Sequence, residues 1–293
     1  MANLVMMALL HGIVMGMIYG AIAIGLSLIF GVLRVINFAH GSMLMASMFC
    51  YYLIFIATGI SPYLSLFLIV PVFFFAGYLI QNVLIKPLFL RERSTVLEPV
   101  SALTLTTGIW FAMDNLALML FGGNFRTMTT PLSGKLFSVG DFNLEITKAA
   151  AFIISILVIV FLSQFLSRTD LGRTIRSVSQ NRDAAALCGV NVYRIYAITF
   201  GIGTASLALV GAFMTGFYFI APSVGAAFGV KSFLIVVLGG LGSLPGALVG
   251  GLLFGIIESV GGQFMPATSA NMLTFLVFII VLFVRPKGIM GKF

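Results

Sequence analysis

Long apolar runs dominate this chain of 293 residues and decide what it can fold into. A helix needs about 20 mostly apolar residues to cross the hydrocarbon core of a bilayer. A membrane β-barrel would instead show segments of about ten residues that alternate apolar and polar positions. The candidate spans are near-continuous Leu, Ile, Val, Phe, Met and Ala, and they lie at residues 4–33, 35–57, 62–85, 99–121, 148–167, 195–220, 228–241, 244–263 and 268–284. The sequence therefore predicts an all-α, polytopic transmembrane helical bundle with eight or nine membrane segments, some of them broken or re-entrant.

Composition excludes a soluble protein. Only 8% of the residues are charged and 60% are hydrophobic, whereas a soluble domain carries about a quarter charged residues. No hydrophilic stretch is long enough to fold separately, so we expect one transmembrane domain over residues 1–293, with a hydrophilic loop at about 168–194. Two cysteines are too few for a disulfide framework or a metal site. The net charge of +8 does not indicate nucleic acid, because the basic residues lie in short loops between apolar runs.

The basic residues predict the orientation in the membrane. Four of the sixteen basic residues do not share the side of the other twelve. They lie around the 122–147 loop and in the apolar run that follows residue 227: Arg126, Lys135, Lys148 and Lys231. The other twelve fall on one side of the predicted bundle: Arg34, Lys86, Arg91, Arg93, Arg168, Arg173, Arg176, Arg182, Arg194, Arg285, Lys287 and Lys292. Because basic loops stay on the cytoplasmic side, we expect a multi-pass protein of the bacterial inner membrane with its N-terminus outside and its C-terminus in the cytoplasm.

One candidate span is awkward. The run 228–241 covers roughly 21 Å of a hydrocarbon core about 30 Å thick, and Lys231 interrupts any backward extension. If this run did not cross, the basic C-terminus would lie outside. We therefore expect a broken or tilted crossing here.

Two polar or glycine-rich breaks each precede a new apolar run, at residues 31–42 and 238–246. Irregular backbone at membrane depth is tolerated only where protein or a water-filled path covers it, and paired interruptions indicate a translocation path. The alternative is that both are ordinary turns, whose Asn and Ser residues satisfy helix ends. The candidate path residues are Asn37, His40, Ser42, Gly240, Gly242 and Ser243.

Glycines repeat at every fourth residue in two of the predicted spans. Small residues at this spacing let helix backbones approach closely inside a bilayer, so we expect packing rather than chemistry from them. They are Gly12, Gly16 and Gly20 near the N-terminus, and the pairs Gly246 with Gly250 and Gly251 with Gly255.

The stretch 167–194 is the most informative hydrophilic segment, with five arginines and a helix-compatible composition. Asp183, Ala184 and Ala185, with Gly189 four residues later, fit the D/E-A-A-x-x-x-G pattern of permeases in ATP-binding-cassette (ABC) importers. There the loop docks on a separate ATPase subunit. From the loop alone, an amphipathic connector whose arginines meet anionic lipid headgroups is an equal alternative.

Taken together, the motifs resemble the permease subunits of branched-chain amino acid ABC importers of the LivH type. The matching stretches occur in the family's order over nearly the whole chain, although the proline that often follows the docking pattern in other importers is missing. They are residues 36–41 (INFAHG), 171–173 (LGR), 184–191, 237–246 (VLGGLGSLPG) and 285–288 (RPKG).

The resemblance implies a machine with several partners: a second, similar permease, two cytoplasmic ATPase subunits and a periplasmic substrate-binding protein. It also implies a path between the two permeases, with Asp183, Ala184, Ala185 and Gly189 as the ATPase-coupling residues. Branched-chain amino acids are the default solute, and small amides, urea or aromatic acids are carried by relatives. We expect no enzymatic activity, metal or cofactor on this chain, with ATP and Mg²⁺ on the ATPase subunits. Accordingly, no G-x-x-x-x-G-K-[ST] phosphate-binding loop occurs.

Three ionisable residues fall inside predicted spans, where such residues face a bundle interior or a cavity. They are Asp114, Lys231 and Glu258. One hypothesis is that Lys231 pairs with Glu258 or Asp114 and holds the second half of the bundle. The rival function is an ion-coupled secondary transporter without ATPase subunits, in which Asp114 and Glu258 would bind the driving ion. A membrane enzyme would need a cluster of titratable residues, which this chain lacks.

Overall fold

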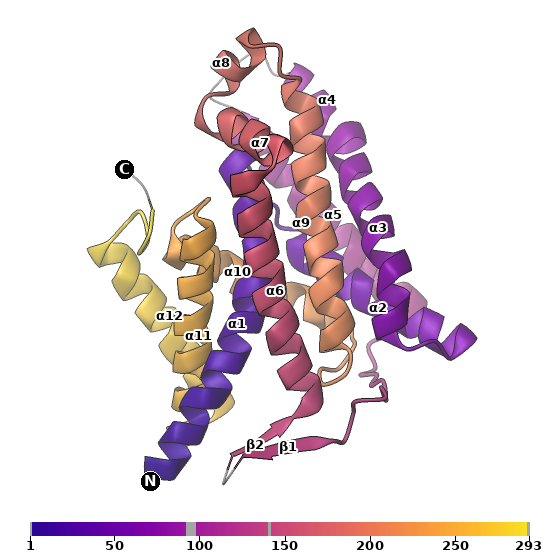
Figure 1. Cartoon of the computed structure of the whole chain (residues 1–293), viewed down its shortest axis with the longest axis vertical. Helices are drawn as coiled ribbons and strands as arrows, with labels where there is room; N and C mark the ends of the chain where they lie inside the picture. Colours follow the sequence, from indigo (N-terminus) through magenta and orange to yellow (C-terminus); the bar gives the residue numbers. More distant parts are fainter. Residues whose placement is uncertain (1, 92–97, 140–141, 292–293) are drawn as a thin grey trace.

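The computed structural model describes residues 2–91, 98–139 and 142–291 (Figure 1). The predicted positions Arg93 and Lys292 lie outside these residues. Nearly all of the described chain is helical. The elements are α1 (Ala2–Leu33), α2 (His40–Thr58), α3 (Pro62–Ile80), the π-helix η1 (Gln81–Ile85), α4 (Lys86–Arg91), α5 (Glu98–Phe121), β1 (Leu136–Val139), β2 (Phe142–Glu145), α6 (Ile146–Arg168), α7 (Asp170–Gln180), α8 (Arg182–Leu187), α9 (Val192–Met214), α10 (Ser223–Gly239), α11 (Leu244–Phe264) and α12 (Ala267–Val284).

The predicted membrane bundle is confirmed. Among the described residues, seven helices are long and apolar enough to cross a membrane, and α10 and α12 are shorter apolar helices. The expectation that Lys231 interrupts its helix was wrong, because α10 begins at Ser223 and continues through Lys231. Its 17 residues extend for about 26 Å. The predicted run 195–220 was also too long, since α9 ends at Met214.

The glycine repeats pack helices together, as predicted. Helix α1 runs antiparallel to α11, and a Cβ atom on Gly16 would lie 2.8 Å from both the carbonyl oxygen of Gly251 and the Cα atom of Leu252. A Cβ atom on Gly250 would lie 2.6 Å from the carbonyl oxygen of Ile235, on α10. These contacts leave no room for a larger side chain, so the glycines set the distances between the helix axes.

The bundle has two distinct ends (Figure 1). The N-terminus and the β1–β2 hairpin lie at one end, called here the hairpin end, and α7 and α8 lie at the other, called here the loop end. In the hairpin, Leu136 pairs with Glu145 in antiparallel register. The basic residues Arg34 and Lys86 lie at the loop end: Arg34 donates to the carbonyl of Ser179 on α7, and the Lys86 ammonium lies 5.8 Å from the ring centre of Tyr193 at the start of α9.

Helix α2 begins inside the bundle rather than at its surface. His40, its first residue, makes a 2.9 Å hydrogen bond through Nε2 with the carbonyl oxygen of Ile22, in the middle of α1. Ile22 lies eleven residues before the end of α1 at Leu33, which places His40 roughly 16 Å below that end. Residues 34–39 therefore re-enter the membrane region in irregular conformation, as predicted for the first break.

Helix α10 also begins inside the bundle. The segment 215–222 precedes it, and a Cβ atom on Gly216 would touch Tyr63 and Thr147, near the hairpin-end starts of α3 and α6. From there the chain turns inward, with Ile220 bridged to Arg126 by two backbone hydrogen bonds of 2.8 and 3.0 Å. The break before α10 is thus a second re-entrant segment, entering from the opposite end of the bundle.

Candidate functional site

The first turns of α2 and α10 meet within the bundle. A Cβ atom on Gly41 would collide with the carbonyl oxygen of Gly225 and with the backbone of Gly229. The reverse contact is looser, since a Cβ atom on Gly229 would lie 3.6 Å from the nearest Gly41 atoms. The glycine in the INFAHG motif is therefore required because the α10 backbone lies directly against it. We call this meeting point the α2–α10 junction, formed by Gly41, Ser42, Gly225 and Gly229.

A carboxylate from α5 lies at this junction. Ser42 donates a 2.5 Å hydrogen bond from Oγ to Oδ1 of Asp114, and the indole Nε1 of Trp110 donates to Oδ2 at 2.8 Å. A Cβ atom on Gly225 would lie 2.8 Å from the same Oδ1. Because N-terminal helix turns carry partial positive charge, the first turns of α2 and α10 compensate part of the carboxylate's charge. Sequence reasoning identified Asp114 as an intramembrane charge but did not connect it with the first break.

The predicted path residues of the first break are buried in this chain. Asn37, His40 and Ser42 are 2%, 1% and 0% exposed. Oδ1 of Asn37 accepts a 3.1 Å hydrogen bond from the backbone N–H of Ala39, so the alternative interpretation, an Asn that satisfies a helix start, describes this contact. His40 instead bonds to α1, and its Nδ1 atom has no partner among the described residues.

The second predicted break lies at the loop end, away from the α2–α10 junction. Gly242 packs on the loop-end part of α1, where its Cβ atom would lie 2.9 Å from the Cα atom of Gly31. Gly240 adopts a positive φ of 108° beside the C-terminal segment, whose Ile289 donates a backbone hydrogen bond to Leu238. Ser243 accepts a 3.1 Å hydrogen bond from the N–H of Gly246 and caps α11.

Gly242 therefore meets Gly31, the first residue of the first break, but the contacts of Gly240, Gly242 and Ser243 in the described chain are with α1, α11 and the C-terminal segment rather than with Asn37, His40 or Ser42. The first turns of α10, at Gly225 and Gly229, meet the first break at Gly41, and the segment 215–222 that leads into α10 was placed mostly within the continuous span 195–220 by sequence reasoning. Its signals were the Gly-Phe-Tyr-Phe-Ile-Ala-Pro run before Ser223 and the two glycines in the first turns of α10. Whether either break lines a solute path stays a prediction.

The hypothesised intramembrane ion pair is present. The ammonium of Lys231 donates to Oε1 of Glu258 at 2.6 Å and to the hydroxyl of Tyr19 at 3.3 Å. The same ammonium lies 4.8 Å from the centre of the Tyr19 ring. This contact joins α10 to α11 and explains why the helix tolerates a lysine.

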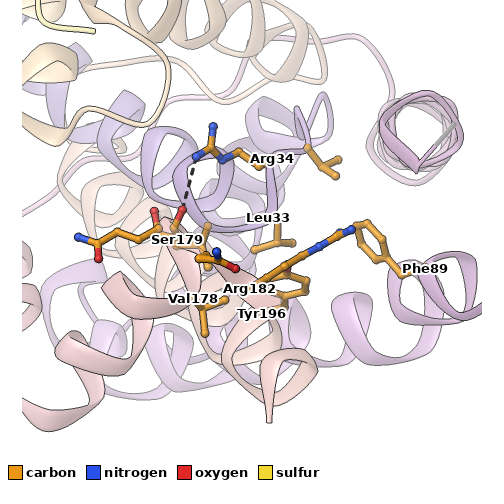
Figure 2. A pocket seen from close by; sticks show the side chains of 11 residues that line it. Leu33, Arg34, Phe89, Val178, Ser179, Arg182 and Tyr196 are labelled. Carbon is orange, nitrogen blue, oxygen red and sulfur yellow. Dashed lines mark hydrogen bonds between the residues drawn. The ribbon is translucent and has the colours of Figure 1, made fainter. Parts of the chain in front are cut away.

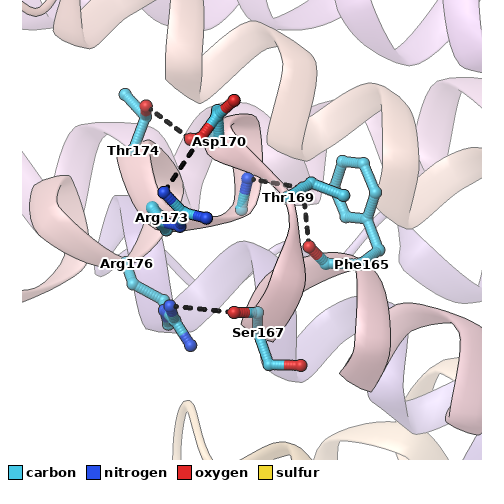
Figure 3. Close-up of polar contacts among 8 residues, drawn as sticks. Phe165, Ser167, Thr169, Asp170, Arg173, Thr174 and Arg176 are labelled. Atoms are coloured by element: carbon cyan, nitrogen blue, oxygen red, sulfur yellow. Dashed lines mark hydrogen bonds and ion pairs between the residues drawn. The ribbon is translucent and has the colours of Figure 1, made fainter.

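The stretch 167–194 contains two short helices: α7, which packs against the loop end of the bundle, and α8, which projects beyond it (Figure 1). Thr169 caps α7 by accepting a 3.0 Å hydrogen bond from Gly172, and Arg173 pairs with Asp170 at 3.0 Å on the exposed side (Figure 3). A Cβ atom on Gly172 would collide with the last turn of α6 near Leu166. The glycine of the LGR motif therefore lets α7 fold back tightly against the end of α6.

Helix α8 contains the predicted coupling residues. Asn181 caps it, with Oδ1 accepting from the N–H groups of Asp183 and Ala184, both at 3.0 Å. The helix ends at Leu187, and Gly189 follows it with a φ of 85°, which suits glycine; Val190 closes the turn by donating to the carbonyl of Ala185.

The outward surface of α8 has an apolar centre that sequence reasoning missed. Leu187 is 90% exposed, whereas Ala185 is buried against the rest of the chain. Isolated exposed leucines are ordinary on a protein surface. This one lies on a short helix that Asn181 caps and that projects from the bundle (Figure 1).

The C-terminal end of α7 is hydrogen-bonded to the start of the first break (Figure 2). Ser179 donates a 2.7 Å hydrogen bond from Oγ to the carbonyl of Gly31, and Arg34 donates to the carbonyl of Ser179 at 3.4 Å. Arg34 has a φ of 59°, which is uncommon for a residue other than glycine. A cavity of about 290 Å³ lies here, and Figure 2 shows Arg182 extending across it toward Phe89. A displacement of α7 would therefore act directly on the segment that leads to the α2–α10 junction.

Comparison with known proteins identifies the family. A family model described as the branched-chain amino acid transport system permease component matches residues 8–282. The chain belongs to this family. Its relatives include the high-affinity branched-chain amino acid transport system permease proteins BraD of Pseudomonas aeruginosa (32% identical, 97% of this chain and 95% of the relative) and LivH of Salmonella typhimurium (30% identical, 96% and 94%). A probable branched-chain amino acid transport permease protein of Methanocaldococcus jannaschii is 26% identical over 92% of this chain and 87% of its own. No solved structure matches the chain significantly.

Proposed function

We propose that this chain is the transmembrane permease subunit of an ATP-driven importer for branched-chain amino acids and forms half of the translocation path. The observation that carries the proposal is the family match over residues 8–282, supported by relatives of nearly the same length whose names specify branched-chain amino acid transport. The helical bundle and the helix α8 that projects at its loop end fit this role. A second, homologous permease supplies the other half.

In the proposed orientation the loop end faces the cytoplasm of a bacterial cell and the hairpin end faces the periplasm. The basic residues at the loop end support this orientation through the positive-inside rule. The N-terminus is then outside and the C-terminus inside. A periplasmic substrate-binding protein delivers the solute at the hairpin end.

Helix α8 is the proposed docking element for one of two cytoplasmic ATPase subunits, which bind ATP and Mg²⁺. Asp183, Ala184 and Gly189 shape this helix, and Leu187 gives it an apolar tip. A rigid element is needed because closure of the ATPases must be transmitted as displacement rather than absorbed by a soft loop. The hydrogen bonds that join Ser179 to Gly31 and Arg34 provide the next step of that transmission.

The proposal is tested by purifying the tagged chain from its native membrane and assaying ATP hydrolysis and leucine uptake in proteoliposomes. We expect a second permease and two ATPases to copurify, and we expect the binding protein loaded with leucine to stimulate hydrolysis. Leu187→Asp should uncouple hydrolysis from the permease, because a charge replaces the apolar anchor. Leu171→Asp is a matched control, since Leu171 is exposed on α7 rather than α8. Recovery of the chain alone, with uptake driven by an ion gradient and independent of ATP, would refute the proposal in favour of a secondary transporter.

A further inference from the structure

One intramembrane carboxylate, that of Asp114, has no cation partner among the residues that the structure describes. Of the eight acidic residues, Asp114 and Glu258 lie within membrane helices away from their ends. Glu258 is neutralised by Lys231. Asp114 accepts hydrogen bonds from Ser42 and Trp110, which are both neutral, and no cation contacts it within the described part of the chain. A carboxylate at membrane depth without a counter-charge is costly and marks a functional position.

The helix that carries this carboxylate has an unusual surface. Of the seven long apolar helices in the described chain, α5 is both the least buried and the lowest in mean hydropathy. Its exposed positions are mostly large and apolar, among them Phe111 and Met119, but they also include Thr104, Gly108 and Asn115. A helix exposed to lipid should be the most apolar, because hydrocarbon cannot solvate polar groups. The low hydropathy and the three polar or small positions give α5, the helix that carries Asp114, a partly polar exposed surface.

We propose that Asp114 recognises the ammonium group of the amino acid as it passes through the membrane. The inference rests on the proposed function and names the residue that binds the positively charged group of the solute. Each oxygen of Asp114 receives one neutral hydrogen bond, which leaves further lone pairs free for an ammonium donor. The half-buried side chain is accessible beside the exposed surface of α5.

The surroundings of Asp114 suit a small apolar zwitterion. Trp110, which donates to Asp114, is stacked with Phe38 and with Phe111 at ring-centre distances of 6.4 and 5.2 Å, so the carboxylate lies beside an aromatic cluster that suits an aliphatic side chain. The opposite side of the carboxylate is closed by the glycine backbone of the α2–α10 junction. Asp114 is therefore fixed by hydrogen bonds from Ser42 and Trp110 while its side chain stays partly exposed, as a recognition group requires.

The test separates the charge of Asp114 from its hydrogen bonds. In Asp114→Asn the amide oxygen can still accept from Trp110 and the amide nitrogen can donate to the hydroxyl of Ser42, so the contacts survive and the charge is lost. Trp110→Phe does the opposite, because it removes the indole donor and keeps the carboxylate. Both variants are assembled into the complete transporter in proteoliposomes. Uptake of radiolabelled leucine, ATP hydrolysis stimulated by the binding protein, and the melting temperature of the complex are then measured.

We expect Asp114→Asn to reduce leucine uptake by about tenfold or more, since charge-assisted hydrogen bonds are among the stronger ones. Stimulated hydrolysis and the melting temperature should stay close to those of the parent complex, and Trp110→Phe should lose less uptake than Asp114→Asn. Unchanged uptake in Asp114→Asn would overturn the inference. Parallel loss of uptake, hydrolysis and melting temperature in both variants would also overturn it, because it would make Asp114 a structural contact. Failure of the parent complex to import leucine with ATP would instead refute the proposed function.

Discussion

The ion pair between Lys231 and Glu258 allows a quantitative prediction about the cohesion of the bundle. The two side chains are 22% and 25% exposed, so the pair is intermediate between a surface contact and a buried one. Exposed pairs contribute at most about 1 kcal/mol, whereas removing one partner of a buried pair costs about 3–5 kcal/mol because the other charge is left unpaired. We therefore expect Lys231→Met or Glu258→Gln alone to lower the free energy of unfolding by about 2–3 kcal/mol.

The double variant should behave differently from the sum of the single ones. With Lys231→Met and Glu258→Gln together no charge is left unpaired, so the free energy of unfolding should return to within about 1 kcal/mol of the parent value. Denaturation in detergent micelles measures all four proteins of the cycle. Additive losses would show that the two charges do not stabilise one another. The charge-reversed pair, Lys231→Glu with Glu258→Lys, should likewise restore transport that either single reversal abolishes, and failure of that rescue would contradict the pairing.

Three further predictions concern two glycines and one helix cap. Gly41→Ala should destabilise the permease by about 2–3 kcal/mol, because its Cβ atom would collide with the α10 backbone; Gly229→Ala is the matched control and should be tolerated, and thermal unfolding compares the two. Gly189→Ala should cost about 1–2 kcal/mol of local strain at a φ of 85°, which should weaken ATPase copurification while leaving the bundle folded. Ser243→Ala should lower stability by about 1 kcal/mol through loss of the α11 cap, with normal uptake; a large loss of uptake at normal stability would favour a path role for Ser243.

The spans could be predicted from the sequence because hydrocarbon imposes a length and a composition on every crossing. The prediction failed where a charge is neutralised by a residue far along the chain. Lys231 looked like an interruption because its partner Glu258 belongs to another helix, 27 positions later. The end of α9 at Met214 was missed for a related reason, since the residues of the next break are as apolar as a helix. Apolar composition indicates burial in the membrane, but it does not separate helix from extended chain.

Only the first of the two breaks that lead to the α2–α10 junction was predicted from the sequence. The INFAHG motif has polar residues that distinguish it from its surroundings, and it does open a helix inside the bundle. The second break was assigned to the glycine-rich run 238–246 because glycine is conspicuous in a sequence. The residues that meet the first break at Gly41 are Gly225 and Gly229, in the α10 turns that follow the segment 215–222. The junction depends on the fit between the backbones of Gly41 and Gly225, and no periodicity in either helix reports such a fit.

The two re-entrant segments lie far apart in the sequence, but they lead to the same place in the bundle. Residues 34–39 enter from the loop end and residues 215–222 from the hairpin end, and both stop at the α2–α10 junction. The loop-end segment begins at Arg34, which is bonded to α7 through Ser179. If ATPase subunits displace α7 as proposed, the hydrogen bonds of Ser179 with Gly31 and Arg34 would apply that displacement to the start of the segment that leads to Asp114. Packed glycine backbones deform little, so the junction should move as a unit, and its movement would change how far the carboxylate is exposed to a passing solute.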